Sequence, residues 1–282
     1  MKGPIAILGA RGMLGTDLAA QCAKAGLATV VFDLPEFDIT KVDAIRRAIG
    51  GASAVVNCAA YTNVEKAEAE PELAAKINAE AVGLLGELAK QAGVAVLHIS
   101  TDFVFDGRLD RPYAETDPAN PVSAYGRTKY QGELALAQSG CRHCIIRVQW
   151  TYGRAGVNFV RKILDAARSG KPMKVVSDQV GSPTATAEAA KAVVAMLQLP
   201  SGLPQGLYHF AAAGFVSRFD MARHIVERLQ LSVVPQPCKT SDFVTAAQRP
   251  LNSCFDCRKI ARVLPEPIAE WQGPLNAYLE SL

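Results

Sequence analysis

The chain has 282 residues, of which 49% are hydrophobic and 20% are charged, a composition typical of an ordinary globular protein. Its length is enough for one large α/β domain, or for a nucleotide-binding domain with a smaller attachment. Thirty lysines and arginines against 27 acidic residues leave a net charge of +3, too small and too evenly spread to indicate a nucleic-acid or membrane partner. We infer a small-molecule partner.

The first 150 residues alternate short apolar runs with helical patterns. The apolar runs are typical of parallel strands that are buried on both faces. Strands are expected at 4–9, 27–32, 54–57, 94–100 and 144–148. Helices are expected at 12–25, 41–49, 71–92 and 122–138. This alternation predicts an α/β fold with a Rossmann-type doubly wound parallel sheet, whose ligand lies beyond the carboxyl ends of the strands.

After Trp150 the pattern loosens, and Pro- and Gly-containing turns separate the helices that are expected near 157–169, 184–198 and 217–230. We therefore divide the chain into a nucleotide-binding domain, residues 1–150, and a smaller C-terminal lobe, residues 151–282, that mainly binds substrate. The helix near 184–198 and an apolar run at 207–210 are candidates to rejoin the sheet.

A glycine-rich turn follows the first strand and opens a helix. Its glycines have the spacing Gly-x-x-Gly-x-x-Gly, and the turn comprises Gly9, Ala10, Arg11, Gly12, Met13, Leu14 and Gly15. Glycine lets the backbone approach a pyrophosphate, and a helix N-terminus offers unpaired N–H groups and a positive dipole end. Tight turns also use glycine for steric reasons alone, but an acidic residue, Asp33, closes the second strand. Together these features predict an NAD(P) site.

The two charged residues near this turn favour different cofactors. Asp33 is placed to accept hydrogen bonds from the adenosine ribose, which favours NADH. Arg11 could pair with a 2′-phosphate, which favours NADPH, or could be an ordinary solvated loop residue. We expect the protein to use both NADH and NADPH.

Tyr125 and Lys129 form a Tyr-x-x-x-Lys pattern within a predicted helix, so both side chains project from one face. A nearby ammonium should lower the pKa of the phenol and make proton transfer to a carbonyl oxygen practicable. The pattern is common by chance, and its other interpretation is an exposed helix face. Its place after a strand that ends at Thr101 matters more, because Thr101 could present its hydroxyl to the same oxygen. These three residues predict reduction of a carbonyl with a hydride from the cofactor.

The seven cysteines and the N-terminus indicate the cytoplasm. The apolar run at the start is too short for a signal peptide, no run approaches the roughly 18 apolar residues of a membrane helix, and without export the thiols should stay reduced. The pairs Cys141/Cys144 and Cys254/Cys257 have a spacing that zinc and redox sites use, but an apolar strand follows Cys144 and a helix is expected from Cys257. We interpret both pairs as structural, and no ligand cluster requires a metal.

These residues resemble the extended short-chain dehydrogenase/reductase superfamily, and longer strings are similar to those of the dTDP-4-dehydrorhamnose reductase family over almost the whole chain. The strings are NCAAYTNVEKAE at 57–68, STDFVFDG at 100–107, RVQWTYG at 147–153, DQVGSPT at 178–184 and RPLNS at 249–253. The resemblance implies reduction of the C4 ketone of dTDP-4-dehydro-β-L-rhamnose to dTDP-L-rhamnose, a step in nucleotide-sugar biosynthesis for cell-surface polysaccharide. It implies a dTDP-linked deoxysugar as the substrate, and some relatives form homodimers.

The resemblance also assigns roles to individual residues. Tyr125 would protonate O4 as hydride arrives at C4, with Thr101 beside it. The cofactor would be contacted by Gly12, Met13, Leu14, Asp33, Asp38, Ile39, Ala60, Tyr61 and Thr62, and Lys129 would hold its nicotinamide ribose. The sugar would be contacted by Thr101, Asp102, Phe103, Tyr125 and Trp150, with Val64 in the pocket wall. Singly, some of these have plainer interpretations: Trp150 as a core aromatic, Asp102 as a turn former and Asp38 as a helix cap.

Three positions depart from the usual strings of the family. Phe103 stands where tyrosine is common, Gln149 replaces a small hydroxyl residue, and Gln248 stands where an arginine often precedes the Arg-Pro pair. Each change alters a polar contact near the expected sugar or nucleotide. A reductase of another dTDP-4-keto-deoxysugar, a sugar-nucleotide epimerase and a non-catalytic, NADP-binding regulatory subunit on the same fold therefore stay open as alternatives.

Overall fold

The structure, a computed structural model, describes residues 3–170 and 172–282. At its centre is a six-stranded sheet in which all neighbouring strands are parallel. The order is β10-β5-β4-β3-β1-β2. These strands are β1 (Ile5–Leu8), β2 (Thr29–Phe32), β3 (Ala54–Asn57), β4 (Ala95–Thr101), β5 (His143–Val148) and β10 (Gly206–Phe210). The chain order reverses between β1 and β3, so the predicted doubly wound sheet is confirmed and its switch point lies at the glycine-rich turn.

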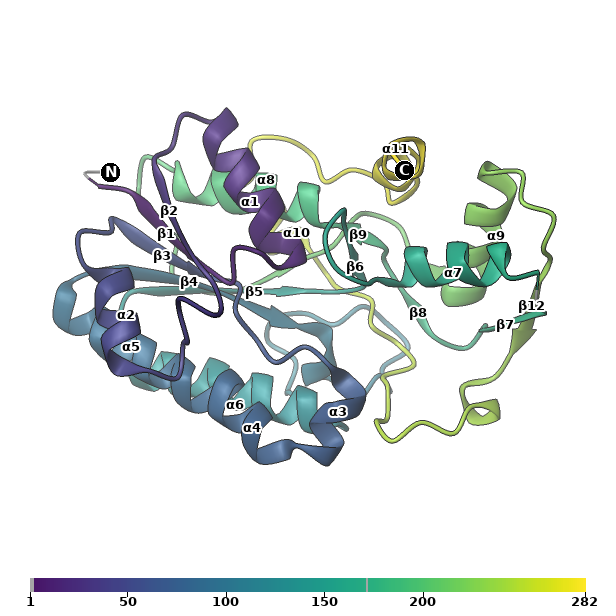
Figure 1. Ribbon diagram of the computed structural model, residues 1–282, viewed down its shortest axis with the longest axis horizontal. Coiled ribbons are helices and arrows are strands. Elements are labelled where there is room, and N and C mark those ends of the chain that lie inside the picture. The colour runs from purple at the N-terminus through teal and green to yellow at the C-terminus, as the bar shows by residue number, and fades with distance from the viewer. Residues whose placement is uncertain (1–2, 171) are drawn as a thin grey trace.

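Helices cover both faces of the sheet (Figure 1). One face carries α1 (Met13–Lys24) and α8 (Thr186–Leu197), and the other carries α2 (Val42–Ile49), α5 (Ala81–Ala92) and α6 (Ala124–Gln138). Strand β1 shows why the sheet needs helices on both faces. Ile5 and Ile7 pack into the core under α1 and α8, whereas Ala6 and Leu8 pack into the core on the opposite face. Successive side chains of a strand point to opposite faces, so an uninterrupted apolar run demands cover on both sides.

The segment from residue 64 to 92, for which the sequence predicts one helix from 71, is more divided. It contains α3 (Val64–Ala69), α4 (Pro71–Ala75), a π-helical turn η1 (Lys76–Glu80) and then α5. The π turn carries Asn78, whose side chain accepts a hydrogen bond from the Tyr61 N–H at 2.8 Å and donates to the Tyr61 carbonyl at 3.1 Å. Single π turns inside helices often occur at functional sites, and this one fixes the backbone of the loop after β3.

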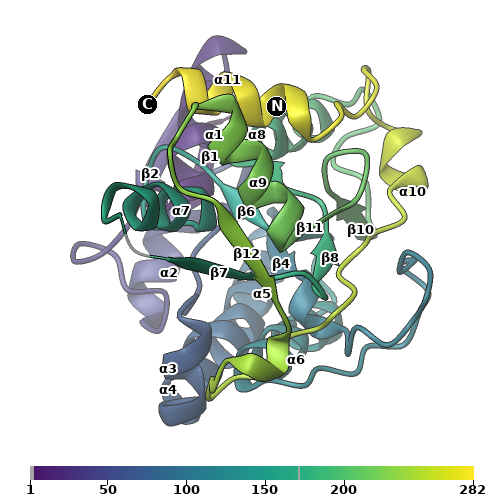
Figure 2. The ribbon, with the colours of Figure 1, turned by 90° about the vertical axis from the view of Figure 1, so that its right-hand side faces the viewer.

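The C-terminal part forms a second core beyond one end of the sheet (Figures 1 and 2). Buried members of this core are Tyr152, Val160, Ile225, Trp271 and Leu275. Its elements are α7 (Phe159–Arg168), α9 (Arg218–Arg228), α11 (Gln272–Glu280) and the parallel pair β7 (Met173–Val176) and β12 (Pro235–Cys238). The C-terminal residues also form two short pairs: β6 (Thr151–Tyr152) with β9 (Thr184–Ala185), and β8 (Val180–Gly181) with β11 (Val216–Ser217).

Two late elements belong to the layers of the central sheet. Strand β10 pairs with β5 at one edge of the sheet, and α8 packs beside α1 through the core that contains Leu18 and Val193. The helix expected from Cys257 is the short α10 (Arg258–Ala261), whose N-cap is Cys257, whereas α11 and β12 were not predicted. Strand β12 reads Pro-Gln-Pro-Cys, which lacks the apolar alternation by which a strand is recognised.

Candidate active site

Strand β4 and helix α6 meet at the carboxyl edge of the sheet. Helix α6 is capped by the Ser123 hydroxyl, which accepts from the Gly126 N–H at 3.1 Å, and the Glu68 carboxylate of α3 accepts from the Ala124 N–H at 2.7 Å. A Cβ at Gly126 would lie 2.1 Å from the Phe103 carbonyl oxygen, so only glycine allows this approach. The helix start is therefore fixed against the turn after β4, the 3-10 helix η2 (Asp102–Val104).

Tyr125 lies beside two predicted site residues of that turn. Its ring meets the Phe103 ring edge to face, with the centroids 5.4 Å apart. Burial raises the pKa of Tyr125 to about 12, and a hydrogen bond with the Thr101 side chain opposes the rise. The sequence predicts a pKa lowered by Lys129, and that prediction is wrong for the protein in this state. Desolvation of the phenolate dominates, because no cation among the described residues balances the charge closely enough.

Lys129 lies one turn further along α6 and is 2% exposed. Its Nζ donates to the Ile99 carbonyl at 2.7 Å and lies 3.2 Å from Nε2 of His98, both on β4. Burial lowers the pKa of Lys129 to about 8, against the opposing effect of Glu133. The side chain is thus held against β4, on the same helix face as Tyr125.

Asp102 connects the turn to the C-terminal lobe. The carboxylate is 3% exposed, accepts from the Ser253 hydroxyl at 2.6 Å and accepts from the Thr101 hydroxyl at 3.1 Å. Burial raises the pKa of Asp102, while these hydrogen bonds and the nearby charge of Arg218 oppose the rise. Asp102 is more than a turn former, because it joins segments that are 151 residues apart in the chain.

Trp150 follows β5 in a left-handed backbone conformation, with φ of 45°. Its ring packs against Gly181, where a Cβ would lie 2.7 Å from the indole. The Arg218 guanidinium stacks over this ring at 3.5 Å from its centroid and also faces Phe159. Burial lowers the pKa of Arg218 to about 9, opposed by Asp102. Among the described residues Arg218 has no hydrogen-bond or ion-pair partner at its guanidinium, so its donors remain available to a ligand.

Gln149, which departs from the usual family string, is 1% exposed. Its Oε1 accepts from the Ser182 N–H at 3.0 Å, so the side chain braces the loop around Gly181. Within the described part of the chain its Nε2 has no partner. A buried amide nitrogen without a hydrogen-bond partner is a candidate donor to a water molecule or a ligand.

The glycine-rich turn has the shape that a dinucleotide requires. Gly9 has φ of 74°, and a Cβ there would lie 2.6 Å from the Ala59 nitrogen. A Cβ at Gly15 would lie 2.2 Å from the Gly9 carbonyl oxygen. Gly12 is the N-cap of α1, no side chain caps that helix, and its first turn holds no acidic residue. The N–H groups of the first turn, at Met13 and Leu14, therefore face outward without an intrahelical acceptor and suit a pyrophosphate.

Asp33 and Arg11 lie together at the end of β2. Asp33 accepts from the backbone N–H of Arg11 at 2.6 Å and of Leu34 at 2.8 Å. The Arg11 side chain, 64% exposed, bonds the Leu34 carbonyl at 2.5 Å and lies 3.2 Å from Glu36. The Asp33 carboxylate thus stabilises the turn, and the Arg11 guanidinium lies at the exposed edge of the turn.

The other predicted cofactor residues have local partners. Asp38 accepts from the backbone and hydroxyl of Thr40 at 2.9 and 2.8 Å, so its side chain closes a turn rather than capping the next helix, whose N-cap is Lys41. Ile39 is buried in the core under α2. Ala60, Tyr61 and Thr62 form the loop after β3, and the Tyr61 hydroxyl donates to Glu70 at 2.5 Å. Val64, half-buried, is the first residue of α3.

A further contact between the two parts of the protein was not predicted. The Glu65 carboxylate forms an ion pair with Arg249 and accepts from the backbone N–H groups of Ala246 and Ala247. Arg249 and Ser253 are the first and last residues of the family string at 249–253. Glu65 and Arg249 are 184 residues apart, so a local sequence pattern could not pair them. Their membership of family strings was the available signal.

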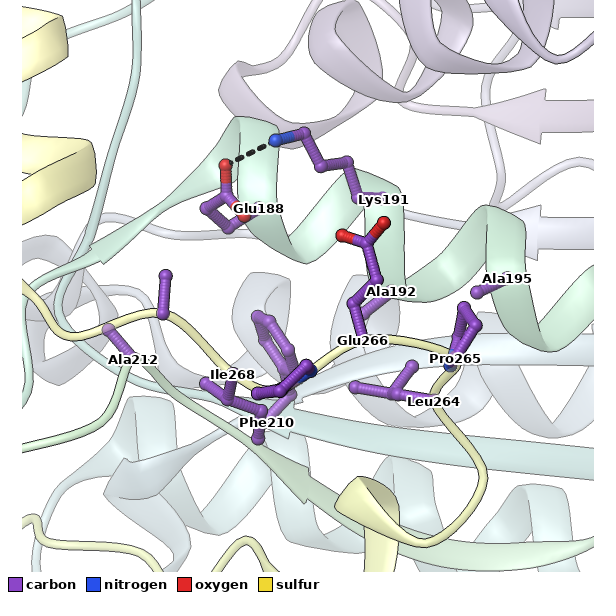
Figure 3. Close-up of a pocket in the computed structure, with 12 residues that line it drawn as sticks. Glu188, Lys191, Ala192, Ala195, Phe210, Ala212, Leu264, Pro265, Glu266 and Ile268 are labelled. Carbon is purple, nitrogen blue, oxygen red and sulfur yellow. Dashed lines mark hydrogen bonds and ion pairs between the residues drawn. The ribbon is translucent and has the colours of Figure 1, made fainter.

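Two cavities lie away from these residues. One, of about 80 Å³, lies between α8, the end of β10 and the segment 264–269, and Figure 3 shows the Glu188–Lys191 ion pair at its side. The other, of about 510 Å³, is lined by the pairs Arg111–Asp117 and Arg258–Asp256. Neither is lined by a residue with a predicted catalytic role.

Within residues 3–170 and 172–282, no group of His, Cys, Asp and Glu side chains could hold a metal ion, and all seven cysteines are free thiols. Burial raises the pKa of Cys144 and Cys257 to about 12 and of Cys254 to about 11. Such thiols stay protonated and unreactive at neutral pH. In the same residues, no helix combines the length and the apolar character needed to cross a membrane.

A parallel sheet with a glycine-rich turn at its switch point and a Tyr-Lys pair on the helix after β4 defines the class of nucleotide-dependent, short-chain-type dehydrogenases and reductases. The RmlD substrate binding domain family matches residues 1–282, and the chain belongs to this family.

Three similar proteins share nearly the whole chain. A dTDP-4-dehydrorhamnose reductase of Mycolicibacterium smegmatis is 37% identical over 96% of this chain and 84% of its own length. A probable dTDP-4,6-dihydroxy-2-methyloxan-3-one 4-ketoreductase of Streptomyces antibioticus is 35% identical over 96% of this chain and 92% of its own. The crystal structure of dTDP-4-dehydrorhamnose reductase from Bacillus anthracis in complex with NADP has a TM-score of 0.94 and 29% identity over 100% of both chains.

Proposed function

We propose that the protein reduces the C4 ketone of dTDP-4-dehydro-β-L-rhamnose to dTDP-L-rhamnose with NADPH or NADH. The observation that carries this proposal is the grouping of Thr101, Tyr125 and Lys129 where β4 meets α6. Membership of the RmlD family and relatives named dTDP-4-dehydrorhamnose reductase support the substrate.

Each of the three residues has a distinct role in this reaction. Tyr125, with its pKa raised to about 12 by burial, is a phenol at neutral pH and carries the proton that O4 requires. The Thr101 hydroxyl, next to that phenol, shares the sugar oxygen and orients it. Lys129 holds the nicotinamide ribose and, when charged, opposes the negative charge left on the phenol oxygen. The nicotinamide, when bound, supplies the hydride to C4.

The cofactor is held by the glycine-rich turn and the loops after β2 and β3. Its pyrophosphate fits the uncapped N-terminus of α1, and its adenosine ribose fits the end of β2, where Asp33 favours NADH and Arg11 favours NADPH. The NADP in the Bacillus anthracis relative supports a phosphorylated cofactor. The proposed contacts are Gly9, Arg11, Gly12, Met13, Leu14, Gly15, Asp33, Asp38, Ile39, Ala60, Tyr61, Thr62 and Lys129.

The sugar is held between the turn after β4 and the C-terminal lobe. Phe103 and Trp150 supply apolar surface, Asp102 supplies a hydrogen-bond acceptor, and Val64 closes the wall. Arg218 is an added candidate, because its stacked guanidinium has donors to offer an anionic or hydroxyl-bearing ligand. Residues 1–150 thus act as the NAD(P)-binding domain and residues 151–282 mainly as the substrate-binding lobe, with α8 and β10 in the layers of the sheet.

The proposal includes the cytoplasm as the compartment and a dTDP-sugar, rather than a nucleic acid, as the partner. Seven free thiols are consistent with a reducing environment. A homodimer stays a prediction, and size-exclusion chromatography with light scattering will measure it.

The test is turnover of enzymatically prepared dTDP-4-dehydrorhamnose by the purified protein. Oxidation of NADH and NADPH is followed by absorbance, and the product sugar is identified by NMR. We expect dTDP-L-rhamnose with either cofactor. Absence of turnover beside an active control enzyme would overturn the proposal and favour a regulatory subunit.

A second candidate is reduction of another dTDP-4-keto-deoxysugar. The buried Gln149 and the Phe103 ring favour it, because both change polarity near the sugar, and a Streptomyces antibioticus relative is named as such a ketoreductase. Parallel assays with 4-ketosugars of the opposite C5 configuration decide between the two. A higher kcat/KM for one of those sugars than for dTDP-4-dehydrorhamnose would select the second candidate.

A further inference from the structure

Three buried polar side chains form a hydrogen-bonded series that ends at Lys129. Asn57 is the last residue of β3, and it pairs in register with His98 of β4. Asn57 and His98 are fully buried, and Lys129 is nearly so. Buried polar groups must satisfy their donors and acceptors within the protein, so the order of donors and acceptors in the series can be worked out.

The orientation of Asn57 is fixed at one end of the series. Its Oδ1 accepts from the Ala59 N–H at 3.0 Å, which directs Nδ2 toward Nδ1 of His98 at 3.1 Å. An amide nitrogen donates and does not accept. Nδ1 of His98 must therefore be the acceptor, and the single proton of the neutral ring lies on Nε2.

The same ring nitrogen, Nε2, lies 3.2 Å from Nζ of Lys129. An ammonium has donors only, so it would face the Nε2–H donor to donor, whereas an amine offers a lone pair. Nζ also donates one hydrogen to the Ile99 carbonyl at 2.7 Å, and it can do so both as an ammonium and as an amine. We propose that His98, oriented by Asn57, is a positioning residue that donates to the amine form of Lys129 and so favours loss of the Lys129 proton in the substrate-free enzyme.

The charges around Lys129 agree with this assignment. Its helix neighbour Glu133 accepts from Arg147 through both carboxylate oxygens, at 2.8 and 2.6 Å, and from the Ser100 hydroxyl at 2.5 Å. That carboxylate is therefore already neutralised. Cys58, the other titratable group near Lys129 on the β3 side, has its pKa raised to about 12 by burial and carries no charge. A buried ammonium without a dedicated anion is costly.

The electrostatics of the His98 ring and of the Lys129 side chain point the same way. Burial lowers the pKa of Lys129 to about 8, and burial also lowers the pKa of His98 well below its ordinary value. Protonation of Lys129 thus competes with the hydrogen bond from His98. The catalytic consequence rests on the proposed function: the ammonium that assists Tyr125 is present below the midpoint of Lys129 and is lost as pH rises through it.

The chain supplies its own control for the tautomer. His209 is also buried, but its Nδ1 lies 3.0 Å from the Tyr113 carbonyl and its Nε2 lies 3.4 Å from Nη1 of Arg147. A carbonyl only accepts and a guanidinium only donates, so His209 must carry its proton on Nδ1. His98 and His209 should therefore be opposite tautomers in one protein.

The experiment is ¹⁵N NMR of the ring nitrogens in the full-length, substrate-free protein about one pH unit above the pKa of Lys129, which burial lowers to about 8, so that the amine form dominates. The chain has four histidines, so a His98→Gln variant assigns the signals of His98 by their loss. We expect protonated Nε2 and unprotonated Nδ1 at His98, with the reverse at His209. A protonated Nδ1 at His98, or an imidazolium, would overturn the proposal.

The charge of Lys129 is measured by titration of its ¹³Cε signal, assigned with a Lys129→Met variant. In His98→Gln the amide can turn its oxygen to the ammonium, so the midpoint should rise by about one pH unit, the equivalent of one ordinary hydrogen bond. Asn57→Asp should also raise the midpoint of Lys129. The new carboxylate would accept from Nδ1–H of His98, and Nε2 of His98 could then accept from the Lys129 ammonium. A midpoint that is unchanged or lower in His98→Gln would contradict the proposal.

The pH dependence of kcat/KM separates this inference from the proposed function. If the ammonium assists reduction, the activity falls as pH rises through the midpoint of Lys129, and in His98→Gln this fall moves to higher pH with the NMR midpoint. A kinetic profile that stays in place while the NMR midpoint moves would refute the catalytic role of Lys129 and uphold the order of hydrogen bonds.

Discussion

The proposed cofactor-binding and sugar-binding parts of the site are built in different ways. At the cofactor end, the turn from Gly9 to Gly15 is one continuous stretch whose backbone forms the site, and the fit depends on the absence of side chains. At the sugar end, Asp102 bonds Ser253, and Trp150 packs against Gly181 and Arg218. A site made of contiguous backbone is specified by local sequence, whereas a site made of side chains from distant segments exists only once the lobe has folded.

Tyr125 is the proposed proton donor beside Thr101 and Phe103, and its removal should give the largest effect. Tyr125→Phe keeps the ring against Phe103 but loses the proton donor, so kcat should fall between about 100- and 10,000-fold. Fluorescence titration with NADPH should show unchanged cofactor affinity. Retained turnover would remove Tyr125 from the reaction, and lost cofactor binding would show that the two ends are not independent.

At the sugar end, Asp102→Ala removes a buried acceptor and leaves the Ser253 hydroxyl unpaired. We expect kcat/KM to fall about 10- to 150-fold, the range for loss of a hydrogen bond to a charged group. Ser253→Ala should have a smaller effect, and the double variant should match Asp102→Ala if Ser253 acts only by holding the carboxylate. Additive losses would show that Ser253 contacts the sugar on its own.

At the cofactor end, Gly15→Ala places a methyl group 2.2 Å from the Gly9 carbonyl and must distort the turn. We expect NADPH to bind at least about tenfold more weakly, a loss near 1.4 kcal/mol, with the KM for the sugar unchanged. Gly273→Ala is the matched control, since no atom lies within 4 Å of a Cβ at that position. Equal cofactor affinity in the two variants would contradict the role of the turn.

The smallest effect concerns the choice between the two cofactors. Arg11 is exposed and has Glu36 as its ion-pair partner, so its contribution should be modest. Arg11→Ala should raise the KM for NADPH by about fivefold and leave the KM for NADH unchanged, as measured by initial rates with each cofactor. An equal change for both cofactors would place Arg11 away from the 2′-phosphate.

The difference between the two ends also explains what the sequence could predict. The strands, the turn and the Tyr-Lys helix follow from apolar periodicity and fixed spacing, and each lies within about two residues of its expected place. Asp102 with Ser253, Glu65 with Arg249 and the stacking of Arg218 on Trp150 could not be predicted from pattern, because each pair joins separate segments. The pKa of Tyr125 was predicted in the wrong direction because spacing reveals a neighbouring charge but not the loss of water around the phenol.

The most direct test of the central claim is transfer of deuterium from cofactor labelled at the nicotinamide C4 to dTDP-4-dehydrorhamnose. The account predicts dTDP-L-rhamnose with deuterium at C4 of the sugar in the wild-type reaction, and formation of that product at least about 100-fold more slowly with Tyr125→Phe. A product without deuterium at C4, a sugar of another configuration, or an undiminished rate with the Tyr125→Phe variant would contradict it.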